Sequence, residues 1–289
     1  MLRKPLIAVI LVLALVTIAC GVNINLPVSQ VKTGPSQTDT ISVPLLQNKS
    51  DVVNINLGFG AGDFSIAPGA GNSIISGTVS YNVPDFKPKV TTDGNNIRIE
   101  QGNLNIGGIP NFSENIKNKW DLFLGNVPMN LQVSAGAYNG DYELGGLSIQ
   151  DLEISDGASN VNVHFSVPNQ IPMNTFRYTT GASSIKLTGL ANANFNNMIL
   201  RCGAGNYELD FSGALMRDTN VNIESGISNV VLMIPQGITV KVTFEGGLSS
   251  INTEGKWEKN GNTYSQSGAG PTIRVNVKMG AGNLDLRNK

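Results

Sequence analysis

Apolar residues along this chain recur at fixed distances on both sides of a short glycine phrase. The phrase reads glycine, a small or apolar residue, glycine or serine, then asparagine, aspartate or serine. Its copies begin at Gly60, Gly136, Gly157, Gly181, Gly203, Gly226, Gly247 and Gly280, and the Gly136 copy is interpreted with two extra residues before Asp141. From Gly136 onward the leading glycines are 21, 24, 22, 23, 21 and 33 residues apart. A period of about 22 residues indicates a solenoid, in which one repeat forms one coil that cannot bury its core alone.

The apolar positions lie five and three residues before each leading glycine, and four and six residues after it. The slot five residues before holds Ile55, Leu131, Leu152, Phe176, Met198, Val221, Val242 and Val275. The slot four residues after holds Phe64, Val161, Ile185, Tyr207, Val230, Ile251 and Leu284. Spacing of two on both sides predicts two β-strands that each turn one face inward. Polar residues such as Asn162, Lys186 and Glu208 occupy the outward slots.

The glycine phrase predicts a corner between the two strands, because glycine readily adopts positive φ and Asn or Asp tolerates the left-handed region. Equivalent residues of stacked coils lie above one another, so we expect a partial amide ladder at Asn160, Asn206, Asn229 and Asn283. Parallel strands joined by crossovers favour right-handed winding. The predicted fold is all-β, a right-handed β-solenoid of about 22-residue coils with an N-terminal β cap.

Residues 1–20 are predicted to be a lipoprotein-type signal peptide. Arg3 and Lys4 make a basic start, and the apolar stretch 5–19 is shorter than the roughly 20 residues that a membrane span needs. The run from Thr17 to Cys20 resembles a lipobox, with Thr17 where Leu is usual. We expect lipidation of Cys20, typically by palmitate, and a place on the extracytoplasmic face of the cell membrane. An uncleaved anchor or an ordinary cleaved signal would also put the folded part outside the cytoplasm.

Three segments are predicted to follow the signal. Residues 21–50 are assigned to a flexible tether, because the stretch 28–43 is rich in Ser, Thr, Gln, Gly and Pro and has little apolar surface to bury. Residues 51–119 are assigned to the β cap, with a hairpin turn at Asp93-Gly94, a strand at 78–81 and a surface loop at 107–119. Residues 120–289 are assigned to the repeat domain, and the Gly60 copy is interpreted as an outlying coil within the cap.

Several runs in this chain carry a family resemblance. They are Trp120-Asp121-Leu122, Val127-Pro128, Leu144-Gly145-Gly146-Leu147 and the stretch 203–213. Together they resemble the toast-rack and putative-adhesin domains of bacterial envelope proteins, and are similar to the C-terminal domains of Lia-type cell-envelope stress-response proteins. The resemblance covers roughly residues 51–289. It implies a β-solenoid at the cell surface and brings no catalytic residues, and the absence of a multi-helix membrane domain argues against a direct signalling role.

Charge and cysteine count exclude further classes of function. Lys plus Arg number 20 and Asp plus Glu number 21, without a basic stripe, so we expect no nucleic-acid partner. The chain has 2 cysteines. Lipidation of Cys20 would leave Cys202 alone, which excludes an internal disulfide and a cysteine metal site.

Catalytic chemistry finds little support in the residues. The lone histidine, His164, is predicted to point outward, and no second histidine can complete a metal pair. No nucleophile elbow is present, and no glycine phrase supplies the lysine of a phosphate loop. Outward carboxylates are the one enzymatic theme, at Asp141, Glu143, Asp151, Glu153, Glu208 and Asp210, yet they build no continuous ladder. We therefore expect no catalytic residue, no cofactor and no bound metal.

The insertion at 255–271 carries the candidate contact residues, Trp257 and Tyr264. Aromatic residues on an outward loop often mark contact sites, and a lid over the flank of the solenoid is an equally good interpretation. The end of the stack after Leu286 is a second candidate surface.

The predicted function is that of a non-enzymatic cell-surface lipoprotein, an adhesin-like binding or scaffolding module of the bacterial envelope. Its expected partners are the cell membrane, through the lipid anchor, and an envelope protein or glycan. A carbohydrate-active β-helix enzyme and an accessory component of envelope-stress sensing remain as alternatives.

Overall fold

A computed structural model describes residues 28–47, 51–103, 109–111 and 116–288. The chain divides into two compact units. The smaller unit, drawn from residues 1–32 and 105–115, contains strands β1 (Val28–Gln30) and β7 (Ile109–Asn111), which pair in parallel. The larger unit, residues 33–104 and 116–289, contains the glycine phrases and one sheet of 15 strands. The signal segment 1–20, including Cys20, lies outside the described residues.

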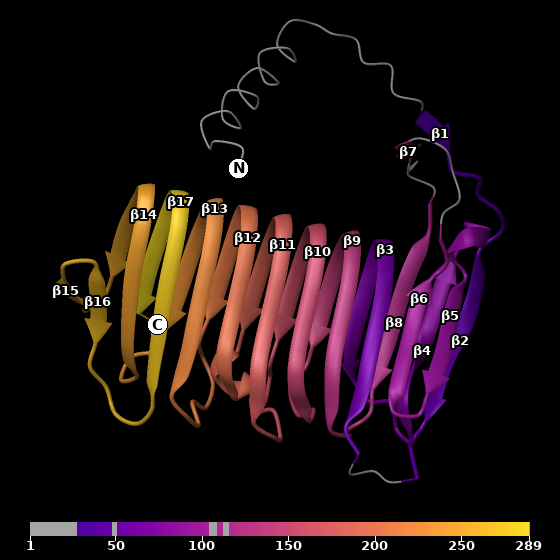
Figure 1. Cartoon of the computed structure of the whole chain (residues 1–289), viewed down its shortest axis with the longest axis horizontal. Helices are drawn as coiled ribbons and strands as arrows, with labels where there is room; N and C mark the ends of the chain where they lie inside the picture. Colours follow the sequence, from indigo (N-terminus) through magenta and orange to yellow (C-terminus); the bar gives the residue numbers. More distant parts are fainter. Residues whose placement is uncertain (1–27, 48–50, 104–108, 112–115, 289) are drawn as a thin grey trace, which may run out of the picture. The chain divides into compact units, whose positions relative to one another are not determined.

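Eight long strands of the larger unit each carry one copy of the glycine phrase, and we call them rungs (Figure 1). The rungs are β3 (Val53–Pro68), β9 (Met129–Glu143), β10 (Ile149–His164), β11 (Met173–Thr188), β12 (Phe195–Asp210), β13 (Thr219–Ile234), β14 (Thr239–Glu254) and β17 (Thr272–Asn288). Neighbouring rungs pair in parallel through both halves, so the predicted β-solenoid is confirmed. Two 3-10 turns, η1 (Pro84–Phe86) and η2 (Leu190–Ala193), lie between strands.

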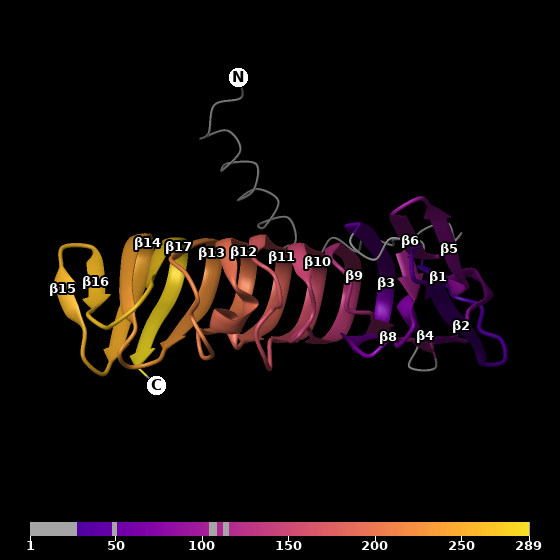
Figure 2. The ribbon, with the colours of Figure 1, turned by 90° about the horizontal axis from the view of Figure 1, so that it is seen from below.

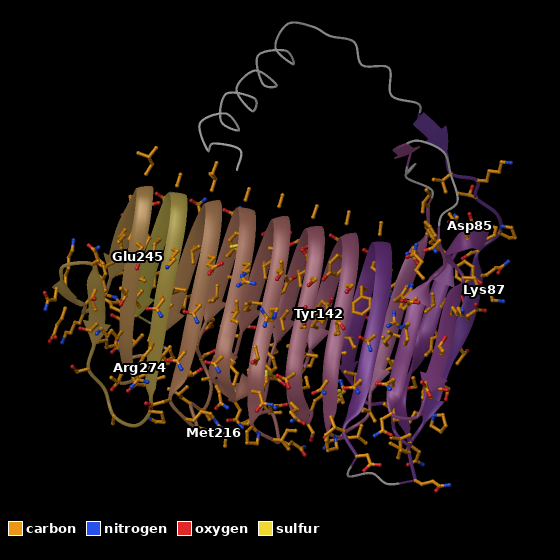
Figure 3. All side chains as sticks on the ribbon, in the orientation of Figure 1. Asp85, Lys87, Tyr142, Met216, Glu245 and Arg274 are labelled. Atoms are coloured by element: carbon orange, nitrogen blue, oxygen red, sulfur yellow. The ribbon has the colours of Figure 1, made fainter. Side chains whose placement is uncertain are left out.

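Each rung bends at its glycine phrase, and its two halves, here called the first and second arms, enclose a narrow core (Figure 2). The predicted inward slots are buried on both arms, as Leu152 and Val161 of β10 show with 1% and 0% exposure. The second arm of β14 is the exception, because Ile251 is only half-buried there. The corners align along the stack, where Ala137, Ala158 and Ala182 are successive register partners. Figure 3 shows the short side chains that result along the bent edge. Two buried faces per rung explain why the apolar period of two appears on both sides of the phrase.

The leading glycines are required by close packing between rungs and not by a left-handed backbone, which corrects the prediction above. Gly181 and Gly203 have no positive φ. A Cβ on Gly203 would lie 2.5 Å from the carbonyl oxygen of Gly181, and a Cβ on Gly181 would lie 2.5 Å from that of Gly157. Left-handed backbone occurs at the third position of the phrase where that residue is glycine, as at Gly205 and Gly282, with φ of 142° and 126°.

The predicted amide ladder is confirmed over part of the stack. Asn229 Nδ2 donates to Asn206 Oδ1, and Asn283 Nδ2 donates to Asn229 Oδ1, both at 3.0 Å. The Ser250 hydroxyl extends the row by donating to Asn283 Oδ1. Asn160 occupies the same row, three rungs from Asn229. The row is exposed, so its value lies in fixing register more than in burying surface.

The Gly136 copy has no insertion, which corrects the interpretation of two extra residues before Asp141. Asn139 is the register partner of Asn160, and Gly140 takes the inward slot. The Tyr138 ring fills the space beside it, because a Cβ on Gly140 would lie 2.6 Å from a ring carbon of Tyr138. Tyr138 is accordingly only 5% exposed.

The folded unit starts earlier than the predicted tether boundary at residue 50. Residues 37–44 form β2 (Gln37–Pro44), which pairs antiparallel with β4 (Ser73–Tyr81). Ile41 and Val43 are buried there. The segment is polar on average, but strand alternation places both residues on one face, which an average over composition does not register.

The Gly60 copy belongs to a full rung and not to the cap. β3 pairs with β9 from residue 53 to residue 66. Its other edge is covered by β6 (Asn96–Gln101) on the first arm and by β8 (Asn118–Leu124) on the second arm. The predicted hairpin at Asp93-Gly94 is confirmed, since it joins β6 to β5 (Pro88–Asp93). Of the predicted surface loop, 118–119 lie in β8, 109–111 form β7, and 107–108 and 112–115 lie outside the described residues.

The stack does not follow chain order at its far end. β17 lies between β13 and β14, so Leu286 is fully buried inside the stack and the expected end surface after it is wrong. The last rung is β14, and only residues 240–243 of its free edge pair with β16 (Thr263–Gln266), which forms a hairpin with β15 (Glu258–Asn260). The 33-residue spacing between Gly247 and Gly280 therefore includes the β15–β16 hairpin and the segment that leads back to β17, which lies between β13 and β14.

Replacing a leading glycine should destabilise the stack in proportion to the clash. Gly203→Ala is expected to reduce the free energy of unfolding by about 1–3 kcal/mol, because the new methyl group meets a backbone carbonyl that cannot rotate away. Thermal melting followed by circular dichroism measures the change. Gly157→Ala, where the nearest carbonyl oxygen is 3.1 Å away, should lose less, and Gly34→Ala, with its nearest atom at 3.8 Å, should melt like the wild type. Equal melting of all three variants would contradict the packing explanation.

Candidate functional site

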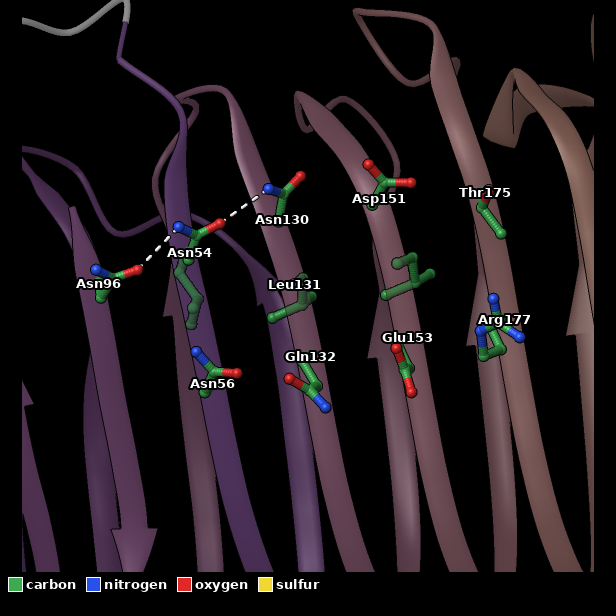
Figure 4. Close-up of a pocket in the computed structure, with 12 residues that line it drawn as sticks. Asn54, Asn56, Asn96, Asn130, Leu131, Gln132, Asp151, Glu153, Thr175 and Arg177 are labelled. Atoms are coloured by element: carbon green, nitrogen blue, oxygen red, sulfur yellow. Dashed lines mark hydrogen bonds between the residues drawn. The ribbon is translucent and has the colours of Figure 1, made fainter.

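A polar groove lies on the outward face of the first arms of β3, β9, β10 and β11, beside β6 (Figure 4). Its volume is about 520 Å³. One row of side chains across the strands contains Asn96, Asn54, Asn130, Asp151 and Thr175, and a second row contains Asn56, Gln132, Glu153 and Arg177. The groove therefore presents amides, two carboxylates, a hydroxyl and a guanidinium to solvent.

The two rows follow from the repeat. They occupy the slots six and four residues before the leading glycine, which alternate with the buried slots, and parallel register places each slot beside its equivalent. These rows were not predicted, because the outward slot that the sequence analysis followed from rung to rung lies five residues after the glycine, on the other arm. The signal was present, since the slot six residues before the glycine is polar at Asn54, Asn130, Asp151, Thr175, Asn197, Asn220 and Arg274.

An amide ladder runs into the groove and stops at β9. Asn54 Nδ2 donates to Asn96 Oδ1 at 2.9 Å, and Asn130 Nδ2 donates to Asn54 Oδ1 at 2.8 Å. Asn130 Oδ1 is buried, and within the described residues it has no hydrogen-bond partner. Its neighbour in the row is the Asp151 carboxylate, which accepts a bond from Asn174 Nδ2 at 3.2 Å. The amide ladder therefore ends at Asn130, beside the carboxylate of Asp151.

Glu153 and Arg177 stand next to each other in the second row, and both are half-buried. Neither side chain makes a hydrogen bond or an ion pair with another of the residues that the structure describes. Their polar groups point into the groove region from neighbouring strands (Figure 4). These two charges are therefore available to a bound molecule.

The two candidate contact residues have different environments. Tyr264 is only 6% exposed, stands opposite Val242 in the β14–β16 pairing and has the Lys259 ammonium 5.3 Å from its ring centroid. Trp257 is half-buried, and its Nε1 donates to the Glu254 carbonyl oxygen at 3.1 Å. It lines a second groove of about 750 Å³ at the β15–β16 hairpin. The lid interpretation therefore describes Tyr264, and Trp257 alone remains open to a partner.

His164 points outward and lies between Glu143 and Thr188 of the neighbouring rungs. Its Nδ1 is 2.7 Å from Thr188 Oγ1, and its Nε2 is 3.8 Å from Glu143 Oε2. Glu143 Oε1 is already occupied, since it accepts bonds from the Gly145 backbone N–H at 2.6 Å and from the Ser166 hydroxyl at 3.0 Å. Half of the His164 side chain is exposed to solvent. Glu143 stabilises the turn that follows β9 through the hydrogen bonds that its Oε1 accepts.

The carboxylates predicted to point outward are divided between two faces, except that Asp210 is buried and accepts a bond from the Ser212 backbone N–H. Glu153 lies on a first arm in the groove, whereas Glu143 and Glu208 lie on second arms, which turn their outward faces the other way. Glu208 pairs with Lys186 at 3.0 Å. The acids named from the sequence therefore do not meet in one site, except that Asp151 and Glu153 share the groove.

Sequence reasoning missed a cluster of hydroxyl groups around Asp156. Tyr178 Oη donates to Asp156 Oδ2 at 2.7 Å, and the Thr180 hydroxyl donates to Asp156 Oδ1. The hydroxyls of Tyr138 and Tyr142 are 2.9 Å apart beside them. Burial is the main cause that raises the pKa of all three tyrosines well above the ordinary value of 10.0. The signal that could have revealed the cluster is Asp156 itself, which directly precedes a leading glycine in a slot that is apolar at Phe59, Ala135 and Met279.

Cys202 is a free and buried thiol. Burial is the main cause that raises its pKa to about 11, so the thiol stays protonated at neutral pH and serves as a small core residue. In the portion of the chain that the structure describes, no three or more His, Cys, Asp or Glu side chains gather closely enough to hold a metal ion. Across the same residues, no helix combines the length and apolar character that crossing a membrane requires.

Residues 32–167 match the family model of the N-terminal domain of toast_rack, DUF2154. This match runs from the approach to β2 through β10 and so includes most of the groove. A search of curated proteins found no significant match.

Several solved structures are similar to the chain. A putative cell adhesion protein from Clostridium sporogenes is 20% identical, with a TM-score of 0.48, over 88% of this chain and 100% of the other. A putative adhesin from Bacteroides fragilis is 10% identical, with a TM-score of 0.41, over 89% and 99%. A putative lipid binding protein from Parabacteroides distasonis is 12% identical, with a TM-score of 0.37, over 90% and 99%.

The two aromatic residues of the hairpin should separate in their effect on stability. Tyr264→Ala is expected to lower the free energy of unfolding by about 3 kcal/mol, because it uncovers the core of the last rung. Trp257→Ala should change it by no more than about 0.5 kcal/mol, as for other surface positions. Thermal melting of both variants measures the difference. Comparable losses for both would show that Trp257 also serves the fold.

Alkaline pH should destabilise the protein through its buried tyrosines. Their pKa is raised in the folded state, so the native chain holds protons that the unfolded chain releases near the ordinary value of 10.0. The stabilising contribution is complete below pH 10 and declines as the pH rises above it. Tyrosinate absorbance for these residues should appear together with the loss of β circular dichroism. Their ionisation near pH 10 in a folded protein would refute the burial assigned here.

Proposed function

We propose that this chain, whose residues 32–167 match the N-terminal domain of toast_rack, is a non-enzymatic, adhesin-like binding or scaffolding module of the toast-rack type held at the extracytoplasmic face of the bacterial cell membrane. Its partner is a component of the envelope, either a protein or a glycan. The observation that carries the proposal is the groove across β3, β9, β10 and β11, whose charged groups Glu153 and Arg177 are not used within the fold.

The proposed location rests on the sequence. A basic start, a 15-residue apolar stretch at 5–19 and Cys20 directly after it together favour export and lipidation. A lipid on Cys20 would hold the chain at the membrane, and the stacked rungs would then display the groove toward other envelope components. A single acyl chain binds a membrane only marginally, so stable anchoring would need a second chain or another membrane-binding signal.

The proposal of a binding role, and not a catalytic one, rests on how the chemical groups are distributed. Glu143 and Glu208 are committed to a turn and to Lys186. The Cys202 thiol is protonated and buried. Asp151 and Glu153 share a groove, and neither forms an ion pair with another described residue, whereas Glu224 and Glu245, which line a second groove, pair with Arg201 and Lys278. Asp151 and Glu153 are therefore the arrangement that favours the alternative of a carbohydrate-active enzyme. Release of sugars from a glycan panel by the purified chain would support that alternative and overturn the present proposal.

Retention of envelope material on the immobilised full chain tests the binding role. An envelope component should be retained by the wild type and largely lost with the double variant Glu153→Ala, Arg177→Ala. Lys186→Ala, which removes an outward charge on the other arm, is the matched control and should retain the component. Retention that is the same for all three chains would place binding elsewhere, and no retention by the wild type would refute the proposal.

The lipid anchor has its own test. Cys20→Ser should abolish incorporation of labelled palmitate and move the protein from the membrane fraction to the aqueous fraction, because the sulfur is the proposed attachment atom. Cys202→Ser is the control, since its thiol is buried and should leave the labelling unchanged. Membrane association that survives Cys20→Ser, with labelling intact, would contradict the assignment.

A further inference from the structure

We propose that the groove binds an uncharged, hydroxyl-rich glycan that lies across the rungs β3, β9, β10 and β11. The inference rests on the proposed function and names the class of ligand for the same groove. Three properties of the groove define the occupant: the spacing of its rows, the order of its acceptors and donors, and the sign of its unpaired charges.

The rows suit a polymer that repeats at the rung spacing. Asn130, Asp151 and Thr175 are register partners on successive rungs, so equivalent atoms recur at about 4.8 Å, the distance between paired strands. An extended chain of β-linked pyranose units advances by a similar interval per unit, with successive units turned over. Such a chain can therefore place one sugar unit, and a hydroxyl group of that unit, against each rung along the groove.

The polar atoms of the groove call for a ligand that both donates and accepts hydrogen bonds. Asn130 Oδ1 is buried without a partner among the described residues, and the Asp151 carboxylate beside it is also an acceptor. Two rungs from Asn130, the Arg177 guanidinium offers only donors. A sugar hydroxyl can donate to the Asp151 carboxylate and accept from the Arg177 guanidinium, and hydrogen bonds to charged groups are the stronger ones.

The charges of the groove differ from two pairs of charges on the same face. Farther along the first arms, Arg201 pairs with Glu224 at 3.2 Å, and Lys278 pairs with Glu245 at 3.4 Å. In the groove, Glu153 and Arg177 are register neighbours, yet no ion pair joins them to each other or to another described residue.

The charges of the groove select against an anionic polymer. The carboxylates of Asp151 and Glu153 repel an anionic polymer, and Arg177 offsets one of these two negative charges, which weakens the attraction for a cationic one. Figure 4 shows the three side chains on neighbouring strands along the groove. An uncharged glycan avoids this repulsion and can use the carboxylates and the guanidinium as hydrogen-bond partners.

Titration of the full chain with four oligosaccharides tests the inference. Cello-oligosaccharide and chito-oligosaccharide are the uncharged probes, oligogalacturonate is the anionic probe and oligoglucosamine is the cationic probe. Calorimetry should show binding of an uncharged probe that exceeds any binding of the charged ones. Asp151→Ala and Arg177→Ala should each weaken it at least about ten-fold, as expected for loss of a hydrogen bond to a charged group.

Matched variants keep the result interpretable. Arg201→Ala removes an arginine from the same face outside the groove and should leave the affinity unchanged. Arg177→Lys keeps the charge but loses the planar fork, so it should weaken binding with the least disturbance of the fold. Each variant is first checked for a wild-type melting temperature.

The groove would be the wrong site if binding survived both alanine variants, or if it were lost only in Trp257→Ala. The ligand class would be wrong if charged probes alone bound. If envelope material is retained but no oligosaccharide binds, the glycan inference fails and the proposed function stands. Absence of retention by the wild type would instead overturn the proposed function on which the inference rests.

Discussion

Backbone contact between successive glycine corners sets the geometry of the repeat unit. The carbonyl oxygen of one leading glycine lies where the next rung would place a Cβ, as between Gly181 and Gly203. Any side chain at this position would push the rungs apart at the corner and interrupt the hydrogen-bonded pairing on both arms. The repeat can vary almost everywhere else, because the inward slots need only apolar residues and the outward slots face water.

Alignment at the corners turns a sequence repeat into rows of equivalent side chains. Once one corner is in register, every outward slot lies beside its counterpart, and a slip by one residue would turn the apolar slots toward solvent. The exposed ladder through Asn206, Asn229 and Asn283 and the groove row through Asn54 and Asn130 are two products of the same register. The groove is therefore a property of several rungs together, and no single repeat contains it.

Local departures from the repeat are compensated by neighbours in space. Gly140 leaves an inward slot empty, and the ring of Tyr138 fills it. β3 would expose an edge, and β6 and β8 cover its two arms. Asp156 brings a carboxylate to a corner, and the hydroxyls of Tyr178 and Thr180 satisfy it. In each case the partner comes from a different slot or rung, so the compensation depends on stacking.

The sequence by itself determined the solenoid, the eight corners, the inward slots and the amide row, because these depend on periodicity that each repeat carries locally. It could not determine that β17 lies inside β14, since copies that share one pattern can stack in any order. The cause that makes the leading glycines necessary was equally hidden, because a Cβ clash with a neighbouring rung exists only once the rungs are stacked. The same division applies to the candidate site. Trp257 could be identified from the sequence as an aromatic residue in an insertion. The burial of Tyr264, and the fact that Glu153 and Arg177 form no ion pair, depend on contacts that exist only in the folded stack. The periodicity can be read from the sequence, but which polar groups remain unpaired depends on distances between residues of different rungs.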